Sequence, residues 1–189
     1  SWIQPAIDEL AEQAMEIHNK KTALIFNTLQ MYRRDRLSYL NKLSARAEAG
    51  RFKLGIKLVR GAYMEKERAR AIELGYPNPI QPDKASTDRD FDAAVTWCLE
   101  RIAEISVFIG THKEDSTRKA VEQMQALGIE PGDTRVYFSQ LFGMSDNLSF
   151  NLASSGYPAA KYLPYGPVKA VLPYLFRRAQ ENSSIQGQA

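Results

Sequence analysis

Short apolar runs alternate with longer amphipathic segments along this chain of 189 residues. Each run is followed within a few residues by polar sequence with helical periodicity, a pattern typical of parallel strands joined by crossover helices. The pattern predicts strands over 23–28, 54–60, 105–109, 135–138 and 159–162. It predicts helices over 33–49, 65–74, 88–104, 114–127 and 168–182, and the residues after Ile3 also have a helical pattern.

Two parallel architectures are compatible with five βα units. An open doubly wound sheet can have five strands, whereas a complete (β/α)₈ barrel needs about 250 residues. The chain opens on a helical pattern with no strand before it, so we interpret residues 1–182 as the later part of an α/β, (β/α)₈ TIM-like barrel. We expect residues 183–189 to form a flexible polar tail, and the proline-rich segment 75–83 to be a loop over the barrel mouth.

Composition excludes several classes of protein. Lys and Arg number 25 against 22 Asp and Glu, and we expect this small excess to be spread over surface helices, as in 33–36. There is no basic stripe of the kind that binds nucleic acid. The single cysteine, Cys98, excludes an internal disulfide, fits a reducing compartment and is expected to be a packed thiol. Two histidines leave little for a transition-metal site. No apolar run approaches the roughly 20 residues of a membrane span, so any membrane contact would be peripheral.

Polar, cationic and aromatic residues gather where the predicted strands end, which is where parallel sheets bind ligands. No carboxylate is among them, so the edge is suited to an anionic ligand such as a phosphate or a carboxylate. Lys113 and the helix that follows it could receive a phosphate. Gln30 could equally cap the next helix, and His112 could be packed against backbone. The residues at this edge are Asn27, Thr28, Gln30, Arg60, Gly61, Ala62, Tyr63, Thr111, His112, Lys113, Gln140 and Tyr162.

Lys57 lies inside a predicted buried strand. Strand alternation places Lys57 and Val59 on one face and Leu58 and Arg60 on the other. Because a buried lysine is costly unless its charge is used, we interpret Lys57 as functional.

The last predicted helix has two adjacent arginines. Tyr174 precedes Arg177 and Arg178 by three and four residues, so the three side chains project toward one side of the helix. A pair of guanidinium groups can hold a carboxylate through several charge-assisted hydrogen bonds. The alternative is a basic helix end that complements its own dipole and pairs with Glu181.

Several of these segments together resemble the proline dehydrogenase family, in its monofunctional mitochondrial and bacterial type. The resemblance rests on 25–30, 57–63, 111–112, 137–144 and 161–182, in order and with matching spacing. It implies a (β/α)₈ barrel, of which this chain covers roughly the fourth to eighth βα units. It also implies non-covalent FAD and oxidation of L-proline to Δ¹-pyrroline-5-carboxylate, with hydride transfer from proline C5 to flavin N5.

The resemblance also implies roles for particular residues. At position 57 many relatives have an arginine beside the flavin, so Lys57 keeps the charge but lacks the bidentate fork. The implied catalytic residues are Lys57, Tyr162, Tyr174, Arg177 and Arg178. The implied cofactor-binding residues are Gln30, Lys57, Val59, Arg60, Gly61, Ala62, Tyr63, Thr111, His112, Lys113, Gln140 and Glu181.

Partners and location follow from the same resemblance. It implies L-proline as substrate, a membrane quinone as electron acceptor, and the remaining barrel strands on the same or another chain. The protein would lie at the cytoplasmic side of a bacterial inner membrane or at the matrix side of the mitochondrial one. Two alternatives remain: hydroxyproline oxidation, which Tyr162 disfavours because hydroxyproline-preferring members tend to have a smaller residue there, and a non-catalytic fragment that needs a complementary chain.

Overall fold

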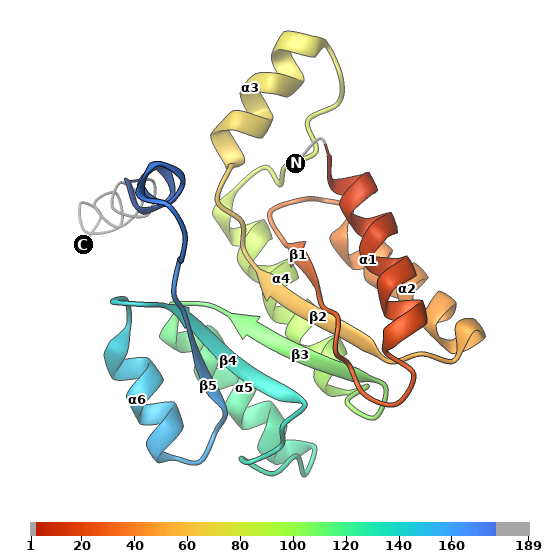
Figure 1. Cartoon of the computed structure of the whole chain (residues 1–189), viewed down its shortest axis with the longest axis vertical. Helices are drawn as coiled ribbons and strands as arrows, with labels where there is room; N and C mark the ends of the chain where they lie inside the picture. The colour runs from red at the N-terminus through yellow and green to blue at the C-terminus, as the bar shows by residue number, and fades with distance from the viewer. Residues whose placement is uncertain (1–2, 177–189) are drawn as a thin grey trace.

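The computed structural model describes residues 3–176 as alternating strands and helices (Figure 1). The sheet is parallel throughout, and its strands are adjacent in sequence order, β1-β2-β3-β4-β5. Residues 168–176 form a further helix after β5. The elements are α1 (Gln4–His18), β1 (Asn27–Gln30), α2 (Arg36–Gly50), β2 (Leu54–Val59), α3 (Met64–Leu74), α4 (Lys84–Leu99), β3 (Ile105–Gly110), α5 (Glu114–Ala126), β4 (Val136–Leu141), α6 (Asp146–Ser154) and β5 (Ala159–Tyr162).

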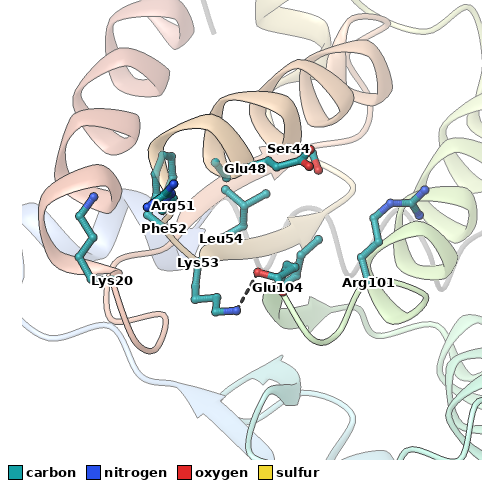
Figure 2. A pocket seen from close by; sticks show the side chains of 11 residues that line it. Lys20, Ser44, Glu48, Arg51, Phe52, Lys53, Leu54, Arg101 and Glu104 are labelled. Carbon is teal, nitrogen blue, oxygen red and sulfur yellow. Dashed lines mark hydrogen bonds and ion pairs between the residues drawn. The ribbon is translucent and has the colours of Figure 1, made fainter.

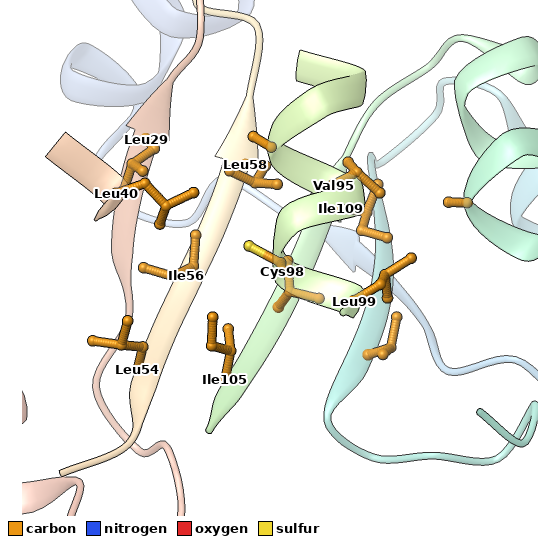
Figure 3. Packing of buried hydrophobic residues seen from close by; sticks show 14 of the residues in the cluster. Leu29, Leu40, Leu54, Ile56, Leu58, Val95, Cys98, Leu99, Ile105 and Ile109 are labelled. Atoms are coloured by element: carbon orange, nitrogen blue, oxygen red, sulfur yellow. The ribbon is translucent and has the colours of Figure 1, made fainter. Parts of the chain in front are cut away.

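One face of the sheet is covered by helices. Alternate strand residues, Leu29, Ile56, Val107 and Phe138 among them, join residues of α1, α2, α4, α5 and α6 in a single hydrophobic cluster (Figure 3). Fully burying a side chain of this kind stabilises the fold by about 1.5–3 kcal/mol. Cys98 is wholly buried in this cluster, and burial raises the pKa of its thiol well above the usual range, which confirms the expected packed thiol.

The opposite face of the sheet carries fewer contacts within the described residues. The rings of Phe108 and Tyr137 stack there with centroids 4.7 Å apart, and Phe26 packs edge-on against Phe108 at 5.1 Å. Lys57 and Val59 lie on this face beside Phe108, in the alternation that the sequence predicts. Because helices cover the outside of a (β/α)₈ barrel, this open face corresponds to the barrel interior. The fold is a partial barrel, as expected.

Two predicted elements need correction, and one helix was missed. The first strand is Asn27–Gln30 rather than 23–28, because Asn19 binds the preceding backbone: its Oδ1 accepts from the N–H groups of Leu24 and Ile25. Helix α4 begins at Lys84, where Asp83 caps it by accepting from Ser86 N, and it ends at Leu99 instead of 104. Helix α6 was not predicted. Of the predicted helix 168–182, residues 177–182 lie outside the described part, as does the tail 183–189.

Part of the basic segment 33–36 is buried, contrary to expectation. Arg33 and Arg36 are 8% and 4% exposed. The Arg36 guanidinium donates to Asp8 of α1 at 2.7 Å and to Asp35 at 2.8 Å, so its charge is paired inside the fold. The hydrogen bonds that Asp35 accepts from Arg36 and Arg33 overcome the effect of burial and hold its pKa well below the usual range.

The segment between α3 and α4 packs against the loop after β1. Ile80 is wholly buried and forms an isolated antiparallel bridge with Arg33, and Gln81 N donates to Tyr32 O at 2.7 Å. Within residues 3–176, none of the helices has the length and apolar character needed to cross a bilayer. The same residues contain no group of three or more His, Cys, Asp or Glu arranged to hold a metal ion.

Candidate active site

Three of the predicted catalytic residues meet at the carboxyl end of the sheet. The Lys57 Nζ lies 5.3 Å from the centroid of the Tyr162 ring, a distance at which an ammonium interacts with the aromatic face. The Tyr174 ring packs edge-on against Tyr162, with centroids 5.9 Å apart and planes at 67°. Helix 168–176 follows β5 (Figure 1) and brings Tyr174 to Tyr162, which in turn contacts the lysine of β2.

Burial shapes the chemistry of this cluster. Lys57 is half-buried, and its desolvation lowers the pKa of the ammonium from its ordinary value. The Tyr162 side chain is still 47% exposed. The arrangement offers one cation and two aromatic walls that face the open side of the sheet, which suits a small ligand with both an apolar part and a negative charge.

Arg60 lies on the other side of the sheet from Lys57. Its guanidinium stacks over the Phe91 ring at 4.2 Å. Three of its nitrogens donate to separate acceptors: Nε to Asp88 Oδ1, Nη1 to Thr111 Oγ1 at 2.7 Å, and Nη2 to Ser116 Oγ at 2.8 Å. Arg60 therefore connects the end of β2 with α4, the end of β3 and α5.

Asp88 was missing from the residues expected at the carboxyl edge of the sheet, which contained no carboxylate. Its Oδ2 accepts from Lys113 Nζ at 2.9 Å and from Lys84 Nζ at 3.1 Å, while its Oδ1 accepts from Arg60. Burial alone would favour the neutral acid, but the hydrogen bonds from Lys113, Arg60 and Lys84 hold the pKa of Asp88 well below its usual range. A charged carboxylate thus lies among the predicted cations.

A chain of hydrogen bonds continues from β3 to β4 and α6. Gln140 is buried and donates from Nε2 to Thr111 O at 3.2 Å, and its Oε1 accepts from Ser149 Oγ at 2.8 Å. His112 is exposed, and its Nδ1 lies 3.1 Å from Ser145 Oγ. Ser149 of helix α6, which the sequence analysis missed, and Ser145 just before that helix therefore contact two predicted cofactor ligands.

The backbone after β2 turns tightly at Gly61. Its φ of +116° favours glycine, and a Cβ there would lie 2.1 Å from Cδ1 of the buried Tyr32 ring. Burial, followed by the nearby charge of Glu67, raises the pKa of Tyr32 to about 12. Ala62 and Tyr63 follow, both partly buried, and Tyr63 is the residue before α3.

The remaining predicted site residues are placed as follows. The Gln30 amide donates to Gln4 Oε1 of α1 at 3.3 Å and caps no helix through a described contact. Val59 lies on the open face beside Gly110. Arg177, Arg178 and Glu181, the predicted carboxylate clamp and one predicted flavin contact, lie outside the described residues.

A hollow among the described residues lies at the opposite edge of the sheet. Its volume is about 600 Å³, and it lies where β2 and β3 begin (Figure 2). Lys53 pairs with Glu104 across it at 2.7 Å. Because parallel sheets bind ligands at their carboxyl ends, we assign the site to the residues above and not to this hollow. Its lining includes Lys20, Glu48, Arg51, Phe52 and Arg101.

The parallel sheet, its one-sided helices and its cationic carboxyl edge define a segment of a (β/α)₈ barrel that is suited to an anionic ligand. The model of the proline dehydrogenase family matches residues 1–189. The chain therefore belongs to the proline dehydrogenase family, as its sequence motifs indicate.

Individual relatives support the same assignment. Proline dehydrogenase 1, mitochondrial, from Homo sapiens is 46% identical over 98% of this chain and 31% of its own length. The Drosophila melanogaster protein of the same name is 42% identical over 98% of this chain and 29% of its own length. Hydroxyproline dehydrogenase from Xenopus laevis is 39% identical over 98% of this chain and 41% of its own length. The chain thus spans well under half of each relative.

Solved structures support the fold. Proline utilization A from Bdellovibrio bacteriovorus, inactivated by N-propargylglycine, aligns with a TM-score of 0.88 at 24% identity, over 95% of this chain and 19% of that protein. A Bradyrhizobium japonicum proline utilization A variant aligns with a TM-score of 0.82 at 27% identity, over 96% of this chain and 18% of that protein.

Proposed function

We propose that this chain forms the substrate pocket and part of the cofactor site of a flavin-dependent proline dehydrogenase. Family membership sets the reaction class, and members are generally flavin-dependent. The observation that carries the proposal is the meeting of Lys57, Tyr162 and Tyr174 on the open face. Two aromatic walls and a cation are suited to a small ring that bears a carboxylate.

The donor set at the carboxyl edge is suited to FAD. Lys57 and Lys113 are cations, the tight turn at Gly61 presents backbone, and Lys113 is 40% exposed. When bound, FAD supplies the acceptor for the two electrons and the hydrogen that leave proline C5. The proposed contacts are those that the family resemblance implies: Gln30, Lys57, Val59, Arg60, Gly61, Ala62, Tyr63, Thr111, His112, Lys113, Gln140 and Glu181.

The protein residues act mainly by orientation. Arg177 and Arg178 are proposed to hold the proline carboxylate through paired charge-assisted hydrogen bonds. The Tyr162 and Tyr174 rings pack on the methylene groups and exclude water. Fixing both ends of a rigid five-membered ring leaves C5 in one position, and such alignment can lower a barrier by several kcal/mol. Substrate with a neutral amine reacts best, so activity should rise with pH as the bound amine loses its proton.

An anaerobic absorbance spectrum tests the proposal. The full-length gene product is expected to show a flavin spectrum that bleaches with L-proline and not with L-alanine. Bound flavin that is not reduced by proline would contradict the assignment of proline as substrate. Protein that binds no flavin would contradict the assignment of FAD as cofactor.

The arginine pair has its own test. Arg177→Met or Arg178→Met should raise KM for proline while flavin content stays near that of the wild type. Arg118→Met is the matched control, because Arg118 is exposed on α5 and pairs only with neighbours on its own helix among the described residues. If flavin content falls in proportion to activity in either arginine variant, the clamp assignment is wrong.

Hydroxyproline is the second candidate substrate, since a relative of 39% identity is named hydroxyproline dehydrogenase. The Tyr162 ring contacts Lys57 and Tyr174. Since hydroxyproline-preferring members tend to have a smaller residue at this position, we propose that the ring takes the space that a substrate hydroxyl would need. We therefore expect kcat/KM to favour proline, and Tyr162→Ser to narrow that preference. A wild-type preference for 4-hydroxyproline would reverse the assignment.

Electron transfer and location complete the proposal. We propose a membrane quinone as the final acceptor, with the protein peripheral to a bacterial inner membrane or to the matrix side of the mitochondrial one. Relatives from animals are named mitochondrial. Turnover with proline and a short-chain quinone, without added dye, would support a quinone as the electron acceptor. Reduced flavin that the quinone does not reoxidise would exclude it.

A further inference from the structure

Asp88 is the common partner of cations from three parts of the chain. Arg60 follows β2, Lys113 follows β3, and Lys84 begins α4. Their nitrogens lie within 3.1 Å of the two Asp88 oxygens. The Asp88 side chain is 16% exposed, so most of the charge is shielded from bulk water.

The carboxylate offsets repulsion that the fold would otherwise impose. Parallel pairing places Val59 beside Gly110, so the residues just after these strands, Arg60 and Thr111-His112-Lys113, are brought close together. Without an anion between them, Arg60 and Lys113 would repel each other in a partly buried setting. Three cations and one carboxylate leave this cluster with a net charge of +2, so the edge remains attractive to an anion.

The bonds to Asp88 also determine which donors remain available. Arg60 donates from Nε, Nη1 and Nη2 to three protein acceptors, which leaves one N–H on each Nη. Lys113 has one described side-chain contact, at Asp88, and its ammonium has three N–H groups. Two of them can therefore bind an external oxygen. Glu114 and Asp115 lie in the first turn of α5, so their negative charges weaken the helix end itself as an anion site.

We propose that Asp88 is a positioning residue for the phosphate-bearing part of the flavin cofactor, acting through Lys113 and Arg60. The inference rests on the proposed function, since it takes the flavin as the anionic ligand. Asp88 fixes the Lys113 ammonium at the carboxyl end of β3 and holds Arg60 against Phe91. A free lysine at this position would lose side-chain entropy on binding a phosphate, and one already held by Asp88 loses less.

The test compares two flavins and two aspartates. Apoprotein of the full-length gene product is titrated with FAD and with riboflavin, which lacks phosphate, and binding is followed by quenching of flavin fluorescence. Asp88→Asn should lower the affinity for FAD by about tenfold, the contribution expected of one well-placed charged hydrogen bond. Riboflavin affinity should be unchanged.

Asp92→Asn is the matched control. Asp92 lies one turn further along α4, and its contacts are with Ser116 and Lys119. The substitution removes the same charge from the same helix, and the amide oxygen still accepts from Ser116. We expect FAD and riboflavin affinities within about twofold of wild type, because surface charge changes alone have small effects.

Other outcomes would overturn the inference. Tighter FAD binding by Asp88→Asn would show that the carboxylate acts only as an opposing charge, and equal weakening of both flavins would show a purely structural role. Where Asp88→Asn fails to fold, Lys113→Met replaces it, with the same selective loss of FAD affinity expected; an unchanged FAD affinity in that variant would refute the positioning role. Wild-type apoprotein that binds neither flavin would refute the proposed function itself.

Discussion

Replacing Gly61 by alanine tests whether the turn after β2 depends on close packing against Tyr32. At φ +116°, an alanine Cβ would lie 2.1 Å from Cδ1 and 2.4 Å from Cε1 of the Tyr32 ring. The ring cannot move away easily, because Tyr32 is 1% exposed and its backbone is bonded on both sides, to Arg60 O and from Gln81 N. Either the turn or the buried ring must therefore shift.

The expected cost has two parts. The strained backbone conformation contributes about 1–3 kcal/mol, and overpacking against a fixed ring contributes about 1–3 kcal/mol. Gly75→Ala is the matched control: its φ is +68°, and a Cβ there meets nothing within 4 Å. For the control, the only expected cost is that of placing an alanine in the left-handed backbone conformation, about 1–2 kcal/mol. Gly61→Ala should thus be the more destabilising by at least about 1 kcal/mol.

Urea unfolding of the full-length gene product, followed by circular dichroism, measures both variants. A third variant isolates the steric part: combined with Tyr32→Ala, which removes the ring, the cost of Gly61→Ala should fall to about that of Gly75→Ala. Equal destabilisation by the two glycine substitutions would refute the packing argument. A cost that persists after the ring is removed would refute it also.

Three further predictions concern other parts of the chain. Asn19→Ala should lower the free energy of unfolding by about 2–4 kcal/mol in urea titrations, because its buried amide makes four hydrogen bonds with backbone groups of the α1–β1 loop and of Lys53. Cys98 should react with a thiol reagent only on unfolding, since burial raises its pKa; a fast native reaction would contradict the packing. Asp88 has a lowered pKa, so the stability it contributes is fully present well above the unfolded value near 4 and is lost progressively as pH falls through that value toward the lower pKa of the folded state. The stability difference between wild type and Asp88→Asn should therefore shrink between pH 5 and pH 2, and a difference constant with pH would contradict it.

The sequence was sufficient to predict the position of a strand where burial alone decides the structure. Strands β2 to β5 start within one residue of the predicted positions, because apolar residues between polar segments have little alternative to a buried strand. The first strand begins later than predicted. The apolar pattern of 23–28 does not reveal whether the backbone bonds to a neighbouring strand or to a side chain, and here the N–H groups of Leu24 and Ile25 donate to Asn19. Helix α6 was missed because its buried face consists of Ser149 and Leu152, which give almost no periodic signal.

The site was predictable only in part, for a topological reason. Residues near the carboxyl ends of strands, such as Gln140 and Lys113, are found from strand positions alone, since parallel strands end at one edge. Asp88 lies in the second turn of α4, after a long loop, and reaches the same edge only through the packing of α4 on α5. No pattern in the sequence marks that contact. The weak signal available was an aspartate at the first position of the predicted helix 88–104, with Lys113 just before the next predicted helix.

Strand alternation divides the carboxyl edge into two functional layers. Lys57 is on the open face with Tyr162, whereas Arg60 is on the helix-covered side with Asp88 and Thr111. The two cations are three residues apart, and their surroundings give them different roles. Loss of Lys57 should alter the pocket and leave the fold intact, because no described hydrogen bond depends on its ammonium. Loss of Arg60 leaves three acceptors from α4, β3 and α5 without their shared donor, so its effect on binding cannot be separated from its effect on structure. Lys57 and Lys113 are therefore the cations whose contact with ligand can be tested separately, whereas Arg60 is a proposed flavin contact that also holds that edge in place.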